Sequence, residues 1–167
     1  YVSDARGDTR WDAVAAHSNC VAVVRSDENE RLLRLLHRLQ AHVHEQRRDV
    51  RNIVVIVDGL DALRRSLDDL NTASECEALE HVLAAADAGT ITIVAGAEVA
   101  AALPTVFLAR CAARWALHLH DPHDAVLLGI AARSVPPAIA GRVVIAGCEL
   151  TAQLIAPQAL TFPATAT

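Results

Sequence analysis

An aspartate stands at the end of the most apolar strand that the sequence predicts, where it could support phosphate or metal chemistry. Residues 53–57 are all apolar, and Asp58 follows them directly. In parallel sheets, ligands bind at the carboxyl ends of the strands. A carboxylate there can hold the water shell of a Mg²⁺ ion bound to nucleotide phosphates, as the acid of a Walker B strand does. Asp58 is therefore the first candidate site residue. The alternative is that it only caps the loop or the helix that follows.

A group of histidines offers a second set of candidate ligands. His118 and His120 would share one face of a strand, with His123 close behind them. The alternative is that these polar residues belong to an edge strand and to the cap of the helix that follows it, and bind no metal. His42 and His44 point to different faces of a helix and have less claim. We therefore expect no metal other than Mg²⁺ at the strand end described above.

Alternating strands and helices are predicted to position these residues. Apolar runs predict strands at 1–6, 20–24, 52–58, 90–96, 114–119, 141–147 and 149–157. Helical spacing predicts helices at about 27–49, 74–89, 97–113 and 121–132, the third interrupted near Pro104 and the last capped by Asp121. The unbroken apolar runs predict strands that are buried on both faces. The pattern indicates one compact α/β sandwich with a mostly parallel sheet and a terminal β-hairpin at its edge.

Composition narrows the class of protein. The net charge of -5 argues against a nucleic-acid surface of the chain's own, because phosphate binding needs clustered basic residues. No apolar run approaches the roughly 20 residues that span a bilayer, so we expect a soluble segment. The four cysteines form no C-x-x-C pair and are expected to be reduced, buried thiols of a cytosolic protein. The chain has no methionine, and we expect Tyr1 to be the edge of a fragment.

Several segments together resemble a known family. The stretches "IVVIVDGLDAL", "AGTITIVAG", "ARCAARWALHLHDPHDAVLLGI", "VPPAIAGRVVIAG" and "AQLIAP" follow one another as in the latter part of an FtsK/SpoIIIE-type ATPase domain. The chain is most similar to the branch found in type VII secretion and related actinobacterial proteins. The resemblance covers residues 1–157 and leaves 158–167 as a flexible tail. It implies a RecA-like P-loop NTPase fold that uses ATP and Mg²⁺ within a ring or tandem of such domains, to move DNA or secreted protein.

The sequence departs from the family's active members at several positions. The Walker A pattern G-x-x-x-x-G-K-[ST] is absent and the chain has no lysine, so we expect that loop upstream of Tyr1 if it exists. Gly59 stands where active members carry the acid that orients the attacking water. Asp61, two residues further on, could reach the site. Residues 95–97 are Ala-Gly-Ala, where the family often has a polar γ-phosphate sensor. These changes predict a degenerate site with weak or absent hydrolysis.

The resemblance implies a function for three arginines, as phosphate sensors or arginine fingers. Arg110 and Arg114 precede a predicted strand in a region from which ring ATPases can reach a neighbour's phosphate. Arg142 matches the family's turn, although Ala140 replaces its usual proline. A surface or interface salt bridge is the alternative for each of them.

Two functional hypotheses remain open. The first is a degenerate ATPase domain of an FtsK/SpoIIIE-type translocase, with Asp58 and Asp61 at the nucleotide and Mg²⁺. The second is a pseudo-ATPase module that serves assembly or binds a substrate peptide without hydrolysis. Under both, we expect other ATPase domains or subunits of the same ring as partners, and DNA or secreted protein as the substrate of the parent protein. We expect a cytoplasmic location, tethered to the inner membrane only through other parts of the parent.

Overall fold

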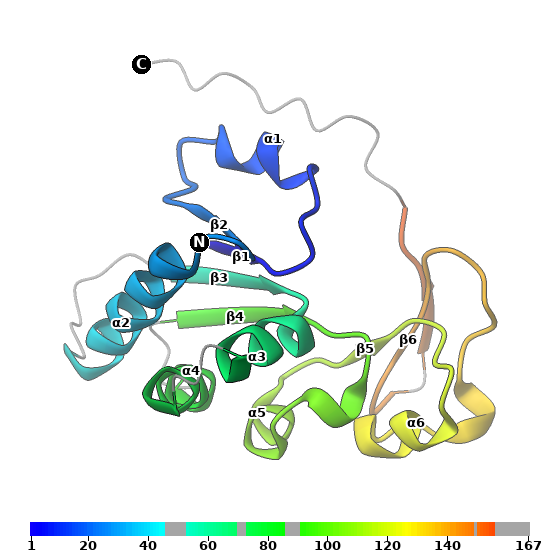
Figure 1. Ribbon diagram of the computed structural model, residues 1–167. Coiled ribbons are helices and arrows are strands. Elements are labelled where there is room, and N and C mark those ends of the chain that lie inside the picture. Colours follow the sequence, from blue (N-terminus) through cyan, green and yellow to red (C-terminus); the bar gives the residue numbers. More distant parts are fainter. Residues whose placement is uncertain (46–52, 70–72, 86–90, 149, 156–167) are drawn as a thin grey trace. The chain divides into compact units, whose positions relative to one another are not determined.

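The chain forms two compact units. The computed structural model describes residues 1–45, 53–69, 73–85, 91–148 and 150–155 (Figure 1). The first unit comprises Tyr1–Glu98, and the second begins at Val99. The predicted tail at 158–167 lies outside the described residues. The assignment of 1–157 to one FtsK/SpoIIIE-like domain stays a prediction.

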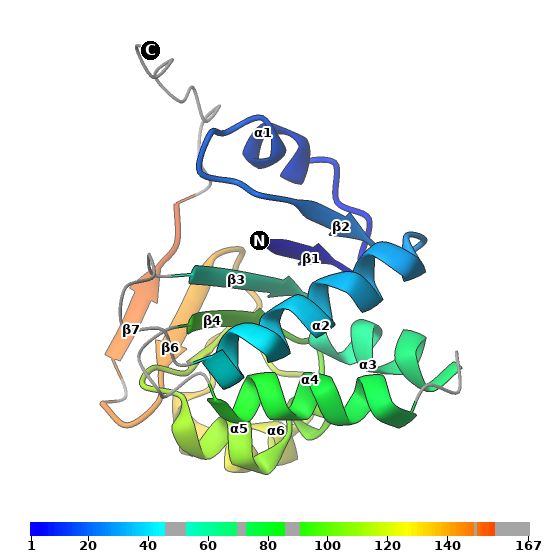
Figure 2. The ribbon, with the colours of Figure 1, turned by 90° about the vertical axis from the view of Figure 1, so that its left-hand side faces the viewer.

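A parallel sheet of four strands is the centre of the first unit. The strand order is β2-β1-β3-β4, with β1 at Val2–Asp4, β2 at Val23–Arg25, β3 at Ile53–Asp58 and β4 at Ile91–Gly96. All three strand pairings are parallel. Figure 2 shows the strands side by side, with β3 and β4 the longest. The predicted α/β class and the parallel pairing are therefore confirmed.

Three helices pack on one face of this sheet. They are α2 (Asn29–Glu45), α3 (Leu60–Asp69) and α4 (Ala73–Ala85), which lie together in Figure 2. The apolar stripe of α2 is buried as its helical spacing predicts, at Leu32, Leu35, Leu36 and Leu39. A void of only about 20 Å³ remains between the three helices and β3. Since a buried leucine contributes about 1.5–3 kcal/mol, this layer supplies much of the driving force for folding.

The prediction that the strands are buried on both faces is wrong for β3 and β4, because the opposite face of the sheet is exposed there. Val54 of β3 and Val94 of β4 are 47% and 54% exposed. In β3, Val55 and Val57 are buried. Successive residues of a strand point to opposite faces, and over β3 and β4 the described helices of the first unit cover only one of them. An unbroken apolar run is thus compatible with a sheet that has one open face.

Two helices of the first unit were not predicted. Helix α1 (Trp11–Ala15) is short, has no buried residue and lies beside β2 (Figure 1). Helix α3 follows Asp58 almost directly, and Leu60, Leu63 and Leu67 are its buried face. The spacing of these leucines is helical. The sequence therefore contained the signal for α3, although the segment was interpreted only as a motif.

The second unit contains a separate antiparallel sheet. Its strands are β5 (Trp115–Ala116), β6 (Arg142–Ile145) and β7 (Leu150–Gln153), in the order β5-β6-β7. The predicted hairpin of β6 and β7 is confirmed. Its predicted place at the edge of the parallel sheet is wrong, because β6 pairs with β5 on its other side.

Short helices complete the second unit. They are η2 (Ala100–Ala102), α5 (Thr105–Arg110), α6 (Pro122–Leu128) and η3 (Ala132–Ser134). The interruption predicted at Pro104 separates η2 from α5. The cap of α6 is confirmed, because the Asp121 carboxylate accepts the His123 N–H at 2.8 Å. Val144, Ala125, Leu128 and Ile130 belong to the buried cluster that holds this unit together.

Candidate functional site

The carboxyl ends of the parallel strands bring three charged residues into one row. Asp4 of β1 is the register partner of Arg25 on one side and of Asp58 on the other. Asp58 in turn is the partner of Gly96 in β4. The structure therefore places Asp58 at the predicted edge of the sheet, on a central strand. Asp4 and Arg25 were not predicted as site residues, although the strand "VSD" ends in an acid as the β3 strand does.

Both oxygens of the Asp58 carboxylate face positively polarised or charged groups. Trp11 donates its Nε1–H to Oδ2 at 2.9 Å. The Nε of Arg6 lies 3.8 Å from Oδ1. The Asp58 side chain is 28% exposed, so most of its surface contacts other groups of the protein, among them Trp11 and Arg6. A hydrogen-bond donor and a guanidinium are unsuitable neighbours for Mg²⁺, which requires oxygen ligands. The residues around Asp58 do not fit a Mg²⁺ ion in this arrangement.

The structure explains why residue 59 is a glycine, which the sequence motif did not reveal. Its φ of 85° lies in the left-handed region, which residues with a Cβ rarely adopt. A Cβ at this position would stand 2.9 Å from the Cγ atom of Arg6. The position after Asp58 is therefore glycine because the chain turns into α3 there and because the Arg6 side chain occupies the adjacent space.

Asp61 lies in the first turn of α3 and is buried, with 7% of its surface exposed. Its Oδ1 is 3.5 Å from NH2 of Arg6 and accepts the backbone N–H of Glu98 at 3.4 Å. Its Oδ2 accepts from Arg65 at 3.3 Å. The structure thus brings the two predicted acids, Asp58 and Asp61, to the same arginine. Both oxygens of the Asp61 carboxylate therefore have donors within the chain.

Arg6 is the common partner of three carboxylates. Besides Asp58 and Asp61, it donates through NH1 to Glu98 Oε1 at 2.6 Å. These four residues are referred to below as the Arg6 cluster. Arg6 is separated from its acids by 52 to 92 residues in sequence, and no local motif marks it. Sequence reasoning therefore missed the residue that dominates the site.

Asp4 is the most deeply buried acid in the row, with no exposed surface. Its Oδ1 accepts three backbone N–H groups, from Arg6 at 3.1 Å, Gly7 at 2.7 Å and residue 8 at 3.2 Å. Its Oδ2 accepts from Arg25 at 3.2 Å. The carboxylate thereby fixes the loop that carries Arg6. It acts on the site through this loop.

The three predicted arginines belong to the second unit. Arg110 ends α5 and is exposed. The guanidinium of Arg114 lies against Gly129, 3.7 Å from where a Cβ would stand. Arg142 begins β6 with its Nε buried and without a hydrogen-bond partner. Their predicted action on a nucleotide phosphate stays a prediction.

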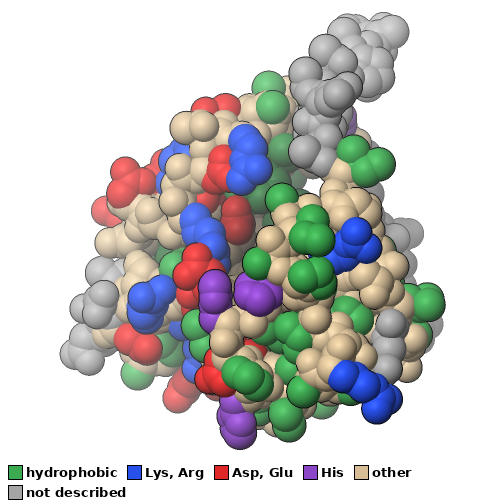
Figure 3. Space-filling view, turned by 90° about the vertical axis from the view of Figure 1, so that its right-hand side faces the viewer, with side chains coloured by type: hydrophobic (Ala, Val, Ile, Leu, Met, Phe, Trp, Pro, Cys, Tyr) green, Lys and Arg blue, Asp and Glu red, His purple; other side chains and the backbone are tan. Residues whose placement is uncertain are grey.

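The histidines and cysteines show no metal site within the part of the chain that the structure describes. The rings of His118 and His120 are 5.2 Å apart, and His118 Nδ1 lies 3.0 Å from the Pro136 carbonyl oxygen. Figure 3 shows histidine side chains close together at the surface. The four thiols are free; three are half-buried and Cys148 is exposed, so their predicted burial is wrong.

The chain was compared with protein-family models, with curated proteins and with solved structures, and none of the three comparisons gave a match. Within the described ranges, none of the helices is both long enough and apolar enough to cross a bilayer.

Proposed function

We propose that this chain is a pseudo-ATPase domain of the FtsK/SpoIIIE type, which serves in the assembly of a translocase without hydrolysing ATP. The motif order described above and the parallel α/β sheet support the resemblance. In the proposal the fold is a RecA-like P-loop NTPase core that has lost its catalytic function. Its partners are other ATPase domains or subunits of the same cytoplasmic ring, which moves DNA or secreted protein.

One observation carries this choice over an active or nucleotide-binding domain: both Asp58 oxygens face donors of the protein itself. Trp11 at 2.9 Å and Arg6 at 3.8 Å surround the carboxylate that an active domain would direct at Mg²⁺. Gly59 also leaves no acid there to orient water. Ion pairs inside the chain replace the interaction with metal and nucleotide, and they link the loop after β1 to β3 and α3. ATP and Mg²⁺ are therefore not cofactors of this chain in the proposal.

Trp11 offers a direct test, because it touches Asp58. The chain has two tryptophans, and the other, Trp115, is 55% exposed, so Trp115→Phe isolates the fluorescence of Trp11. We expect that Mg²⁺ and ATP together leave this fluorescence unchanged and that no phosphate is released. In the Asp58→Asn variant, too, we expect Mg²⁺ and ATP to leave the fluorescence unchanged and to release no phosphate.

The opposite result is equally clear. Saturable quenching of Trp11 by Mg²⁺ and ATP, or phosphate release, would contradict the proposal if Asp58→Asn abolished it. Asp12→Asn is the matched control, because the Asp12 side chain is 65% exposed and lies outside the Arg6 cluster. Loss of the signal in this control as well would indicate a non-specific effect of charge.

A further inference from the structure

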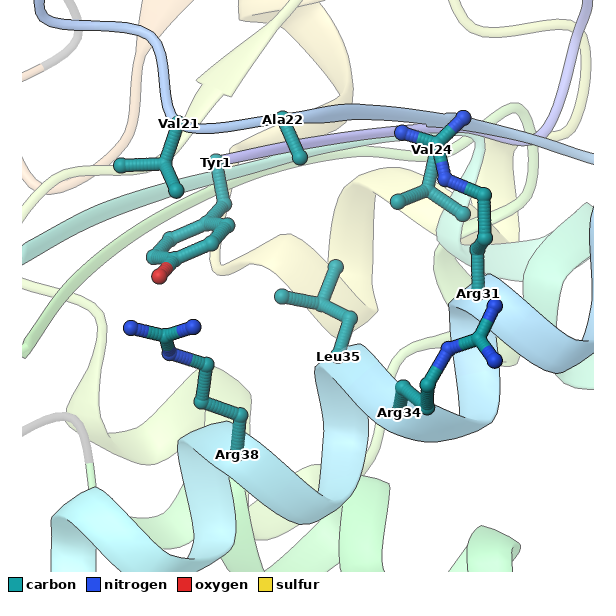
Figure 4. Close-up of a pocket in the computed structure, with 8 residues that line it drawn as sticks. All are labelled: Tyr1, Val21, Ala22, Val24, Arg31, Arg34, Leu35 and Arg38. Carbon is teal, nitrogen blue, oxygen red and sulfur yellow. The ribbon is translucent and has the colours of Figure 1, made fainter.

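A pocket of about 310 Å³ lies between β2 and α2 of the first unit (Figure 4). Its apolar floor comes from Val24 of β2, from Leu35 of α2 and from Val21 just before β2. Val24 and Leu35 are buried, whereas Val21 is 64% exposed. None of the pocket residues belongs to the Arg6 cluster. The pocket is therefore a candidate site that is separate from Asp58.

Three arginines of α2 line the pocket on its open side. Arg31, Arg34 and Arg38 follow one another at intervals of three and four residues, which places them along one helix face. At a rise of about 1.5 Å per residue, they span roughly 10 Å of the helix. Figure 4 shows Arg31 and Arg34 at one end of the pocket and Arg38 at the other, beside the Tyr1 ring, with Leu35 between them.

The charges of these arginines are only weakly neutralised within the chain. Arg31 forms an ion pair with Glu28. Arg34 lies 3.6 Å from Glu30, and both side chains are strongly exposed, at 69% and 90%. Arg38 lies 6.0 Å from the centre of the Tyr1 ring and forms no ion pair with another described residue. Exposed ion pairs contribute roughly 0–1 kcal/mol, so an external anion can replace them.

We propose that this pocket binds an acidic, extended segment of a partner protein. Alternate side chains of an extended strand are about 6.6 Å apart, which suits carboxylates placed on Arg34 and Arg38 by flexible arginine side chains. Three cations spread over this length exceed what one small anion can contact. The apolar side chains between the carboxylates point to the opposite face of the segment and would pack on Val21.

The lining favours a peptide over a nucleic acid. Single-stranded nucleic acids bind to surfaces on which aromatic side chains stack with successive bases. This pocket offers a single aromatic ring, Tyr1, and an aliphatic floor. Aliphatic side chains of a peptide match such a floor. The inference does not depend on ATP, so it can fail or succeed independently of the proposed function.

The test uses a fluorescein-labelled peptide of about eight residues in which glutamate and leucine alternate, long enough to span the three arginines. Binding to the 167-residue chain is followed by fluorescence anisotropy at low and at moderate salt. We expect saturable binding that weakens with salt. The variant carrying Arg34→Glu and Arg38→Glu should lower the affinity at least about tenfold.

Two further variants separate the pocket from general charge effects. Arg133→Glu changes the charge of an exposed arginine in the second unit and should leave the affinity unchanged. Val21→Ser removes apolar surface at an exposed position and should lower the affinity about threefold without affecting the fold.

Three results would overturn the inference. The first is the absence of binding to the wild-type chain. The second is equal binding of a control peptide in which glutamine replaces glutamate. The third is tighter binding of a single-stranded oligonucleotide with the same dependence on Arg34 and Arg38, which would assign the pocket to nucleic acid instead. Thermal unfolding of each variant, followed by circular dichroism, confirms that the helix α2 is intact.

Discussion

Two groups of arginines in the first unit have opposite surroundings. Arg6 and Arg25 lie at the carboxyl end of the sheet among acids: Arg6 contacts Asp61 and Glu98, and Arg25 contacts Asp4. Arg34 and Arg38 lie on the outer face of α2, where their charges face solvent. The four residues have the same chemistry, but among the described residues only the first two contact buried acids.

This difference distinguishes structural charges, which are paired within the fold, from available charges, which are free to bind a partner. A buried carboxylate without a partner is strongly destabilising, so acids such as Asp4 and Asp61 require the donors that surround them. The result is a strand end whose polar groups are already satisfied by the protein. The arginines of α2 are exposed and can exchange their weak contacts for those of a partner. The site suggested by the sequence motifs, at Asp58, is therefore already occupied by groups of the protein itself. The site that is open to a partner lies on α2, where the sequence shows no motif.

The largest effect is expected for Asp4→Ala. This change leaves three backbone N–H groups and Arg25 without their buried acceptor, and it should lower the free energy of unfolding by about 3–5 kcal/mol. Urea unfolding measures it. Asp4→Asn retains an acceptor and should lose less, which keeps the test informative if the alanine variant does not fold.

The control for Asp4 is an acid that shares its arginine. Asp12 also contacts Arg25, but its side chain is 65% exposed. Asp12→Ala should therefore change the stability by less than about 1 kcal/mol. Equal losses for Asp4→Ala and Asp12→Ala would remove the distinction between structural and available charges.

The second prediction concerns the turn after Asp58. Gly59→Ala places a Cβ at a φ of 85° and 2.9 Å from Arg6, and it should lower the stability by about 1–3 kcal/mol. Thermal unfolding measures the loss. Gly7→Ala is the matched control, because Gly7 has a φ of 74° and nothing within 4 Å of its Cβ position. If the two variants lose the same stability, the contact with Arg6 contributes nothing.

The parts of the fold that could be predicted are those with local signals. The unbroken apolar runs identify β3 and β4, and the leucine stripe identifies α2, because burial on one face of a helix imposes a helical period on the sequence. Asp58 was placed at the end of its strand because it follows the apolar run directly. The capping residue Asp121 was also predicted, since its partner His123 is two residues away.

The site itself could not be predicted, because its partners are far apart in sequence. Arg6 and Glu98 are joined by a hydrogen bond across most of the first unit, and Trp11 reaches Asp58 from a short helix with no buried face. No spacing rule connects such residues. The sequence could show that the acid after Asp58 is missing, but only the structure shows that Arg6 lies beside Gly59.

The third prediction tests whether the Arg6 cluster holds the structure together. Arg6→Ala leaves Asp58, Asp61 and Glu98 without their common cation. Because Arg6 is 34% exposed, the loss is partly screened by solvent, and we expect about 1 kcal/mol, measured by urea unfolding at low salt. Arg10→Ala, at an arginine that is 89% exposed and pairs with Asp8, should have a smaller effect. A larger loss for Arg10→Ala would contradict the importance given to the cluster.

The smallest effect concerns Glu28, which lies between the two groups of arginines. Its pKa is lowered chiefly because it accepts the backbone N–H of Arg25, and further because the Arg31 guanidinium pairs with it. A lowered pKa in the folded state stabilises the protein above the ordinary glutamate value of 4.5, and this stabilisation is lost as the pH falls through the folded-state pKa. Glu28→Gln should therefore lower the stability by about 0.5 kcal/mol near neutral pH, and the difference from the wild-type chain should shrink in acid.

Glu30→Gln provides the comparison for this pH dependence. Glu30 is 90% exposed and lies 3.6 Å from Arg34, so its removal should change the stability little at any pH. Thermal unfolding of both variants across the acid range distinguishes the two glutamates. A pH-independent difference for Glu28→Gln would mean that its carboxylate charge does not hold Arg31. In that case Arg31, like Arg34 and Arg38, would be fully available to the acidic segment proposed above.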